Sequence, residues 1–195
     1  MQDEAFSHLF KDESLKALEP LGLPPLWRRE PGFATLIHII LEQQVSLASA
    51  KAAFERLQKV ATPLAPATFL NLDDAALKQV GFSRQKTRYG RALADAILTG
   101  TLDLEGLAEL RDAAAKEHLT RVKGIGNWTA DIYLMMALGR PDIWPKGDLA
   151  LAVAVKEVKG LKGRPTPEEL EGLAQGWRPY RSAAARLLWH YYLSR

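Results

Sequence analysis

Cysteine is missing from this chain of 195 residues. Its absence excludes disulfides, thiolate zinc sites, cysteine-ligated iron–sulfur clusters and cysteine nucleophiles. Histidine is scarce as well, and no close metal-ligand spacing relates the four that are present, His8, His38, His118 and His190. Thiol chemistry and a compact histidine metal site are therefore not expected.

Long hydrophobic runs are also missing. No apolar stretch reaches transmembrane length, and the N-terminus lacks the basic and then apolar order of a signal peptide, because it carries Asp3, Glu4, Asp12 and Glu13. We therefore expect a soluble cytoplasmic protein that does not associate with membranes. The chain is long enough to bury a substantial core, as one large domain or as two small subdomains that share a cleft.

The sequence lacks the sustained alternation of polar and apolar residues that is typical of strands. Apolar residues recur at helical spacing, so the sequence predicts an all-α fold. One helix is expected to begin at Pro31 and to run to about residue 41. Others are expected over roughly 5–18, 46–60, 67–79, 83–99, 112–121, 127–138, 149–158, 167–175 and 180–193. The best-defined start is Thr166-Pro167-Glu168-Glu169, which has the residues of a capping box with proline at the first helical position.

Charge of one sign does not dominate the chain, whose formal net charge is only +3. The distribution is uneven, since residues 121–195 hold 12 Lys and Arg against 7 Asp and Glu, whereas residues 1–120 hold 14 against 16. A basic excess in the C-terminal part is compatible with a polyanion on one face, although a solvated surface is the commoner cause of so small an imbalance.

The most informative segment is LTRVKGIGNWTA at residues 119–130. It predicts two helices joined by a Gly-x-Gly hairpin at Gly124 and Gly126. Glycine lets the backbone take a positive φ and approach a ligand closely, and the positive end of the next helix suits a phosphate. A helix C-cap followed by an ordinary turn is the simpler interpretation of a lone Gly-x-Gly. Arg121 and Lys123 beside the turn favour the phosphate site.

Asp148 lies twenty residues after Trp128, directly before a further predicted helix. The hairpin and this residue could together place a phosphate grip, an aromatic face and a negative charge around one cleft. Taken by its spacing alone, Asp148 is slightly better explained as the N-cap of the helix that begins at Leu149.

Four segments together carry a family resemblance. They are GIGNWTA at 124–130, PKGDL at 145–149, ILEQQVS at 40–46 and WRPYRS at 177–182. On these motifs the chain resembles the helix-hairpin-helix DNA glycosylase superfamily, and most closely its AlkA-like 3-methyladenine DNA glycosylase II branch. The resemblance extends from about residue 30 to the C-terminus. Joint occurrence makes it far more specific than any single motif.

The resemblance implies an all-α, two-lobed helix-hairpin-helix glycosylase fold with a central cleft that holds the flipped base. Residues 1–195 would then form one compact unit of two helical subdomains. Larger AlkA-like enzymes carry an extra N-terminal β-rich domain. Too few residues precede Trp27 to supply it, so we expect no such domain here, and a pocket wall that differs from theirs.

The resemblance also implies roles for individual residues. It makes Asp148 the catalytic carboxylate, a role that can coexist with helix capping. It assigns contacts with the DNA backbone to the hairpin residues Lys123, Gly124, Gly126 and Thr129. In this family the hairpin commonly holds a monovalent cation through main-chain carbonyls, which map onto Thr120, Val122 and Ile125. No other cofactor is expected.

Aromatic residues are expected to recognise the base. Trp128 and Tyr180 match family positions that line the base pocket, and Trp27 is a further candidate on local pattern. Aromatic residues at helical spacing more often belong to the core, which is the better interpretation for Phe33, Phe69 and Trp189. Trp128 also stands where bifunctional relatives have a Schiff-base lysine, which argues for hydrolysis without strand cleavage.

Gln44 matches the position of the residue that enters the duplex when a base leaves it. Before the family match is considered, a polar helix end explains this residue about as well.

The chemistry of base release agrees with these roles. Cleaving a base from deoxyribose develops positive charge on the sugar, which a carboxylate can stabilise. We therefore predict a monofunctional DNA glycosylase that removes alkylated bases such as 3-methyladenine from double-stranded DNA in base excision repair, acting as a monomer associated with the nucleoid. The alternatives are a non-catalytic helix-hairpin-helix DNA-binding module and a glycosylase for oxidised or mismatched bases. The first would not explain Asp148 together with Trp128 and Tyr180.

Overall fold

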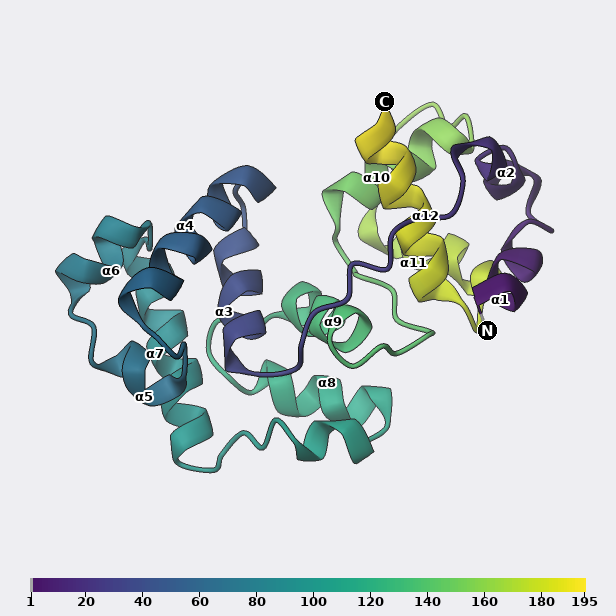
Figure 1. Ribbon diagram of the computed structural model, residues 1–195. Helices are drawn as coiled ribbons and strands as arrows, with labels where there is room; N and C mark the ends of the chain where they lie inside the picture. Colours follow the sequence, from purple (N-terminus) through teal and green to yellow (C-terminus); the bar gives the residue numbers. More distant parts are fainter. Residues whose placement is uncertain (1) are drawn as a thin grey trace. The chain divides into compact units, whose positions relative to one another are not determined.

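A computed structural model describes residues 2–195 of the chain, and all its regular elements are helices (Figure 1). The all-α prediction is therefore confirmed. The α-helices are α1 (Gln2–Leu9), α2 (Glu13–Lys16), α3 (Phe33–Glu42), α4 (Leu47–Val60), α5 (Pro66–Leu70), α6 (Asp74–Val80), α7 (Arg84–Leu98), α8 (Asp112–Thr120), α9 (Asn127–Met136), α10 (Leu149–Val158), α11 (Pro167–Ala174) and α12 (Arg181–Ser194). Short 3₁₀-helices are η1 (Glu19–Leu21), η2 (Gly106–Glu109) and η3 (Gln175–Trp177).

The chain divides into two compact units. The central unit comprises Arg29–Leu138, and the terminal unit comprises the residues up to Arg28 together with Gly139–Arg195. The prediction of one compact body made of two helical subdomains concerns how these units combine, and it stays a prediction.

Helix α3 forms the core of the central unit. Its sequence FATLIHIILE is apolar on most of its circumference, which is typical of a helix buried on several sides. Accordingly Leu36, Ile37, Ile39 and Ile40 are fully buried, and α3 packs against α4, α7 and α9 (Figure 1). The hairpin between α8 and α9 is thereby attached, through α9, to the buried helix α3.

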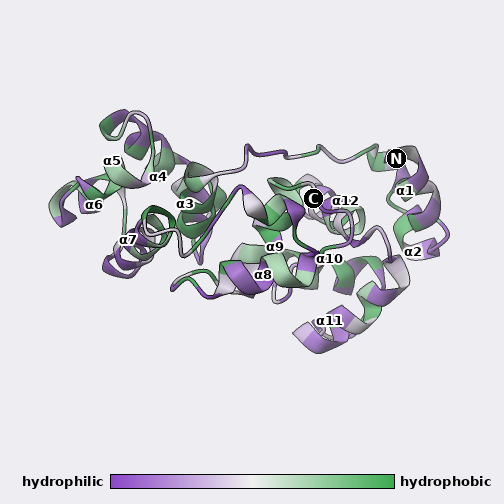
Figure 2. Cartoon of the chain, turned by 90° about the horizontal axis from the view of Figure 1, so that it is seen from below, coloured by the Kyte–Doolittle hydropathy of each residue, from purple (hydrophilic) through white to green (hydrophobic). Residues whose placement is uncertain are grey.

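In the terminal unit, α10 packs against α12. Leu151 and Val155 of α10 are fully buried, as are Leu187 and Leu188 of α12. Helix α11 contacts α10 and presents a hydrophilic outer side (Figure 2). Its first turn has the predicted capping box, because Thr166 Oγ1 accepts from the amide of Glu169 at 3.2 Å and Glu169 Oε2 accepts from the amide of Thr166 at 2.7 Å.

Two predicted helices are each divided in the structure, and aspartate explains both divisions. The helix expected over 5–18 breaks before α2, where Asp12 Oδ1 caps the amide of Ser14 at 3.0 Å. Asp12 Oδ2 also accepts from Trp177 Nε1 and Lys159 Nζ, at 2.9 Å each. The helix expected over 67–79 breaks before α6, where Asp73 Oδ1 accepts from the amide of Ala76 at 2.7 Å. Aspartate is better suited to cap the start of a helix than to lie in its interior, because its side chain hydrogen-bonds to nearby backbone N–H groups.

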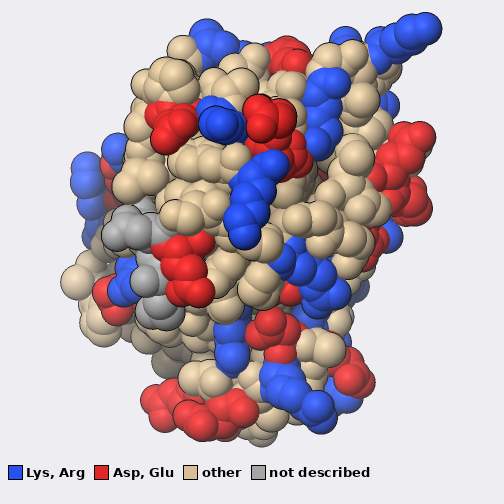
Figure 3. All heavy atoms as spheres, turned by 90° about the vertical axis from the view of Figure 1, so that its right-hand side faces the viewer, with Lys and Arg blue, Asp and Glu red and all other residues tan. Residues whose placement is uncertain are grey.

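The face of the molecule drawn in Figure 3 carries Lys and Arg interspersed with Asp and Glu. Oppositely charged side chains pair in the terminal unit, as Lys146 does with Glu171 at 3.0 Å. Within residues 2–195, no helix is both long and apolar enough to cross a membrane.

Candidate functional site

The predicted hairpin joins α8 to α9, and its two glycines have different roles. Gly124 has φ +97°, in the left-handed region. A Cβ added there would lie 2.2 Å from Cγ of Tyr89, so glycine is required both by backbone conformation and by packing. Gly126 has an extended backbone with φ −89°, and an added Cβ would meet no protein atom within 4 Å. Only the first glycine is therefore explained by the fold.

Gly126 is the N-cap of α9, and no side chain caps the helix there. Lys123 is exposed on the turn before it. An uncapped helix start beside an exposed lysine carries positive potential from both the helix dipole and the ammonium group. The local arrangement is thus suited to an anion.

Gln43, which was not singled out in the sequence, fixes the end of α3 to the hairpin. Its Nε2 donates to the carbonyl oxygen of Gly124 at 2.9 Å and to Oγ1 of Thr129 at 3.0 Å. The next residue, Gln44, is exposed and has φ +56°, which is uncommon for a residue other than glycine. The hairpin and the predicted wedge residue are therefore held together through Gln43.

Thr129 is only 1% exposed. Its hydroxyl accepts the Gln43 bond inside the central unit, and the DNA contact that the resemblance implied for Thr129 stays a prediction. Its observed role is to support the hairpin from within.

The three carbonyls expected to hold a cation lie at the end of α8 and in the turn after it. Val122 O accepts from the amide of Ile125 at 3.0 Å and keeps a second lone pair. No backbone N–H within residues 2–195 donates to the carbonyl oxygens of Thr120 or Ile125. Carbonyl oxygens are ligands that suit an alkali cation, so the donor chemistry of this set fits the expected ion.

Asp148 belongs to the terminal unit and is the N-cap of α10, as its spacing predicted. Its Oδ1 accepts from the amide of Leu151 at 2.9 Å. The same oxygen accepts from Nε1 of Trp189 at 3.2 Å. The capping role is therefore real, and a second donor from α12 orients the carboxylate beyond what capping alone requires.

Trp189 was expected in the core and is indeed buried, with 9% of its surface exposed. It also contacts Trp27, with ring centroids 6.4 Å apart and ring planes at 73°. Trp27 has φ +45°, a rare conformation for a bulky side chain that marks local strain. Trp27, Trp189 and Asp148 thus form one connected group in the terminal unit. The contact between Asp148 and Trp189 spans 41 residues, and no short motif records it.

The loop that leads to Asp148 is fixed by α12. Arg181 Nε donates to Asp142 Oδ1 at 2.8 Å, and Arg178 Nε donates to Asp142 Oδ2 at 3.0 Å. Burial raises the pKa of Asp142, but its hydrogen bonds and ion pairs with Arg181 and Arg178 outweigh burial and lower it. Ser182 Oγ accepts from the amide of Ile143 at 3.0 Å. Arg181 and Ser182 belong to the WRPYRS motif, which therefore has a structural role.

Tyr180 lies at the N-cap of α12 and is half-buried. Its ring contacts the ring of His8, with centroids 5.4 Å apart. A hydrogen bond to Glu4 raises the pKa of the Tyr180 hydroxyl. Trp128 lies in the first turn of α9 in the central unit and is also half-buried. Neither of these two aromatic side chains is fully enclosed in its unit.

The all-α fold, the helix-hairpin-helix turn and the aspartate that caps a later helix define a chain of the helix-hairpin-helix glycosylase class. The chain belongs to the HhH-GPD superfamily of base excision DNA repair proteins, whose family model matches residues 37–179.

Individual relatives agree with this assignment. The putative DNA-3-methyladenine glycosylase YfjP of Bacillus subtilis is 34% identical over 124 residues, which are 64% of this chain and 43% of that protein. The DNA-3-methyladenine glycosylase 1 of Schizosaccharomyces pombe is 29% identical over 166 residues, which are 83% of this chain and 72% of that protein. The chain spans 43% and 59% of the first two curated relatives that it matches.

Among solved structures, the 3-methyladenine DNA glycosylase of Schizosaccharomyces pombe in complex with abasic DNA superposes with a TM-score of 0.90 at 28% sequence identity, covering 95% of each chain. The DNA-3-methyladenine glycosidase of Bacillus halodurans gives a TM-score of 0.77 at 29% identity, covering 95% of this chain and 87% of that one. The family resemblance predicted from the motifs is confirmed.

Proposed function

We propose that this chain is a monofunctional DNA N-glycosylase that flips alkylated bases such as 3-methyladenine out of double-stranded DNA and releases them by hydrolysis in base excision repair. It would act as a monomer and leave an abasic site. The observation that carries this proposal is the geometry of Asp148, whose Oδ1 accepts from both the amide of Leu151 and the indole of Trp189.

This geometry supports a catalytic role for Asp148. Breaking the bond between base and sugar develops positive charge on the deoxyribose, and a carboxylate in a fixed orientation stabilises that charge without reorganising. Two donors on one oxygen restrict the rotation of the carboxyl group about its last bond. In this mechanism Asp148 stabilises the cationic sugar or orients the attacking water, and Trp189 is a positioning residue.

An alkylated purine is already positively charged, so it leaves without strong acid assistance and can be recognised by aromatic faces. We assign this recognition to Trp27, Trp128 and Tyr180. Cation–π contacts contribute about 0.5–2 kcal/mol each. The strained backbone of Trp27 supports its assignment, because strain is retained mainly where function requires it.

The central unit supplies the proposed grip on DNA. Lys123 and the open backbone of Gly126 would contact phosphates, and Gln44 would fill the gap that the flipped base leaves. Gly124 keeps its place in the hairpin because no other residue fits beside Tyr89. Thr129 supports the turn from inside through Gln43.

Two arginines of the terminal unit also support binding of a polyanion. The Nε of Arg186 is buried and has no hydrogen-bond partner within residues 2–195. Burial, and then the charge of Arg28, lower the pKa of Arg186. Two neighbouring guanidinium groups repel each other, and a phosphate between them would relieve this repulsion.

We further propose that the carbonyls of Thr120, Val122 and Ile125 hold a monovalent cation, and that no other cofactor is required. A bound cation would hold the hairpin carbonyls in one orientation. Replacing potassium and sodium with choline at constant ionic strength should therefore weaken DNA binding. An affinity that does not change would contradict the cation site.

The experiment that tests the proposed function is base release from a panel of defined duplexes. The panel contains 3-methyladenine, 7-methylguanine, 8-oxoguanine, a G·T mismatch and undamaged DNA. Release of the alkylated bases alone supports the proposal. Release restricted to 8-oxoguanine or the mismatch would identify a glycosylase for oxidised or mismatched bases. Tight binding without any release would identify a non-catalytic DNA-binding module.

A further inference from the structure

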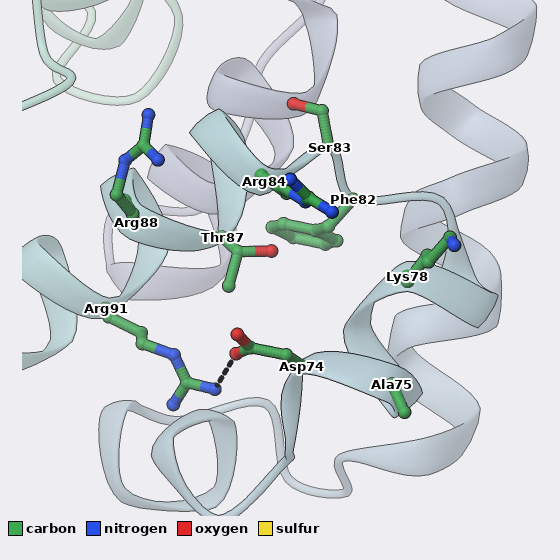
Figure 4. Close-up of a pocket in the computed structure, with 9 residues that line it drawn as sticks. All are labelled: Asp74, Ala75, Lys78, Phe82, Ser83, Arg84, Thr87, Arg88 and Arg91. Atoms are coloured by element: carbon green, nitrogen blue, oxygen red, sulfur yellow. Dashed lines mark hydrogen bonds and ion pairs between the residues drawn. The ribbon is translucent and has the colours of Figure 1, made fainter.

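A basic cavity lies in the central unit between α6 and the first half of α7, away from the hairpin turn itself. Its volume is about 670 Å³. The lining residues are Asp74, Ala75, Lys78, Phe82, Ser83, Arg84, Thr87, Arg88 and Arg91 (Figure 4). Phe82 and Thr87 are buried, whereas Lys78, Arg84 and Arg88 are exposed. The cavity therefore combines a buried floor with basic side chains on its rim.

The charges around this cavity do not cancel. Its one acidic lining residue, Asp74, pairs with Arg91 at 2.7 Å. Within residues 2–195, no acidic side chain pairs with Lys78, Arg84 or Arg88. These three cations leave the cavity with an excess of positive charge.

Thr87 provides an observation that does not depend on charge. Only 7% of the residue is exposed, and no hydrogen bond of its hydroxyl is found within residues 2–195, but the hydroxyl oxygen itself is not sealed in the core. Figure 4 shows the hydroxyl pointing into the cavity. A hydroxyl that opens into the cavity and is not used by the protein is free to donate a hydrogen bond to a ligand that supplies an acceptor.

The backbone adds to the same potential. Helix α7 has 15 residues and begins at this cavity, where Ser83 Oγ accepts from the amide of Lys86 at 3.2 Å. The start of a helix of this length carries partial positive charge. The helix, the three cations and the Thr87 hydroxyl therefore all favour an oxyanion.

The same helix contacts the hairpin. Tyr89 of α7 packs against Gly124, and Gln85 Nε2 donates to the Tyr89 hydroxyl at 2.6 Å. Arg84 directly precedes Gln85, and Arg88 directly precedes Tyr89. The two arginines therefore lie one helical turn apart, on the face of α7 next to the one that contacts the hairpin. Because one helix carries both groups, the cavity and the hairpin are fixed relative to each other.

We propose that the α6–α7 cavity binds a phosphate group, with Arg84 and Arg88 as charge partners and the Thr87 hydroxyl as donor. The phosphate would belong either to the DNA backbone, next to the contacts of the hairpin, or to free phosphate. Binding of a DNA phosphate rests on the proposed function, whereas binding of free phosphate does not.

The test removes the two arginine charges from the folded chain of 195 residues. The variant Arg84→Gln/Arg88→Gln is compared with Lys59→Gln/Arg111→Gln, which removes two exposed cations of the same unit outside the cavity. Affinity for an undamaged duplex is measured over a range of salt concentrations. If the cavity holds backbone phosphates, the arginine variant loses about tenfold in affinity at low salt. The slope of log affinity against log salt falls by up to about 1.8. The control changes much less.

Thr87→Val tests the hydroxyl separately. Valine keeps the shape of the side chain, and the substitution does not change the charge of the cavity. It should therefore weaken binding by a few-fold and leave the salt slope unchanged. Titration with inorganic phosphate in the absence of DNA tests the other source. If the parent binds inorganic phosphate and the arginine variant does not, while both bind DNA with the same affinity, the cavity is a site for free phosphate.

Equal behaviour of the arginine variant and its control with both DNA and inorganic phosphate would overturn the proposal. This failure is distinguishable from failure of the proposed function, because base release at saturating DNA does not depend on the cavity. A protein that releases alkylated bases normally with an inert cavity would refute only the cavity. A protein that binds phosphate there and releases no base would refute only the glycosylase.

Discussion

The hairpin of the central unit is held in place mainly through its backbone, whereas the Asp148 group of the terminal unit is held through its side chains. In the hairpin, the backbone of Gly124 fits under Tyr89 and its carbonyl accepts from Gln43. In the Asp148 group, side chains far apart in sequence hold one another, from Trp27 to Trp189 to the carboxylate. We infer that the exposed side chains of the hairpin tolerate substitution better than the side chains around Asp148.

The two groups also differ in the quantity that they should control. Exposed Lys123 and the open Gly126 belong to a surface that can hold a phosphate, so they should set affinity. The oriented carboxylate of Asp148 should set the rate of base release. The predictions below test this division, beginning with the largest expected effect.

Asp148→Asn should reduce base release by about 10²–10³ while leaving folding and DNA affinity nearly unchanged. Asparagine keeps the size of the side chain and its ability to cap α10, but it lacks the charge that a cationic transition state requires. Single-turnover base release from an alkylated duplex measures the effect. A thermal melt of the same variant is the control. Near-normal release by a stable variant would refute the catalytic role.

Gly124→Ala should destabilise the protein and weaken DNA binding together. The left-handed backbone alone costs about 1–2 kcal/mol for alanine, and the methyl group would also collide with Tyr89. Gly126→Ala is the matched variant, since its backbone is extended and its surroundings are open. It should melt like the parent and lose affinity only for DNA. Equal melting temperatures for both variants would contradict the packing described for Gly124.

Trp189→Phe should slow base release about tenfold with little change in DNA affinity. The ring remains to fill the core and contact Trp27, but the hydrogen bond to the carboxylate, which contributes about 1.5 kcal/mol, is lost. Trp144→Phe shortens another buried indole of the same unit and serves as the control. If both variants slow release equally, the effect comes from packing and Trp189 does not position Asp148.

Lys123→Ala should weaken binding several-fold on every duplex sequence and reduce the salt slope by about 0.9, as expected for one lost phosphate contact. Lys162→Ala removes an exposed lysine of the terminal unit and should have a smaller effect. Fluorescence anisotropy at several salt concentrations measures both. An unchanged affinity and slope for Lys123→Ala would mean that the hairpin is only structural.

Borohydride trapping of a covalent adduct between the protein and DNA is expected to give no signal, which makes it the smallest of the predicted effects. Because Trp128 stands where bifunctional relatives have a lysine, no Schiff base should form and no covalent adduct with lesion DNA should accumulate. A bifunctional helix-hairpin-helix glycosylase serves as the positive control. A trapped adduct of this protein would show lyase chemistry and contradict the monofunctional assignment.

The features that the sequence predicted well are those that a local pattern encodes. Helical periodicity located α4, α7 and α10 to within a residue of their observed ends. The capping box at Thr166 was confirmed because all its partners lie within four residues. The family motifs located the hairpin and Asp148 for the same reason. In contrast, the break between α5 and α6 depends on whether the aspartate at 73 caps or continues a helix.

Burial and contacts between distant residues could not be predicted. The sequence placed Trp189 in the core but gave no sign that its indole meets Asp148, 41 residues away. It gave no sign that the side chain of Thr129 is buried and accepts a hydrogen bond from Gln43. Gln43 and Gln44 are identical in type, yet one is bonded internally and the other is exposed with φ +56°. Only the folded chain distinguishes them.

The central claim is that the hairpin sets DNA affinity and that Asp148 sets the rate of base release. Its most direct test applies two measurements to each of two variants. Asp148→Asn and Lys123→Ala are each assayed for affinity and for single-turnover release at saturating concentrations of one 3-methyladenine duplex. We expect Asp148→Asn to lose rate but not affinity, and Lys123→Ala to lose affinity but not rate. If Asp148→Asn releases the base at nearly the parent rate, or if Lys123→Ala slows release at saturation as strongly as Asp148→Asn does, the division is contradicted.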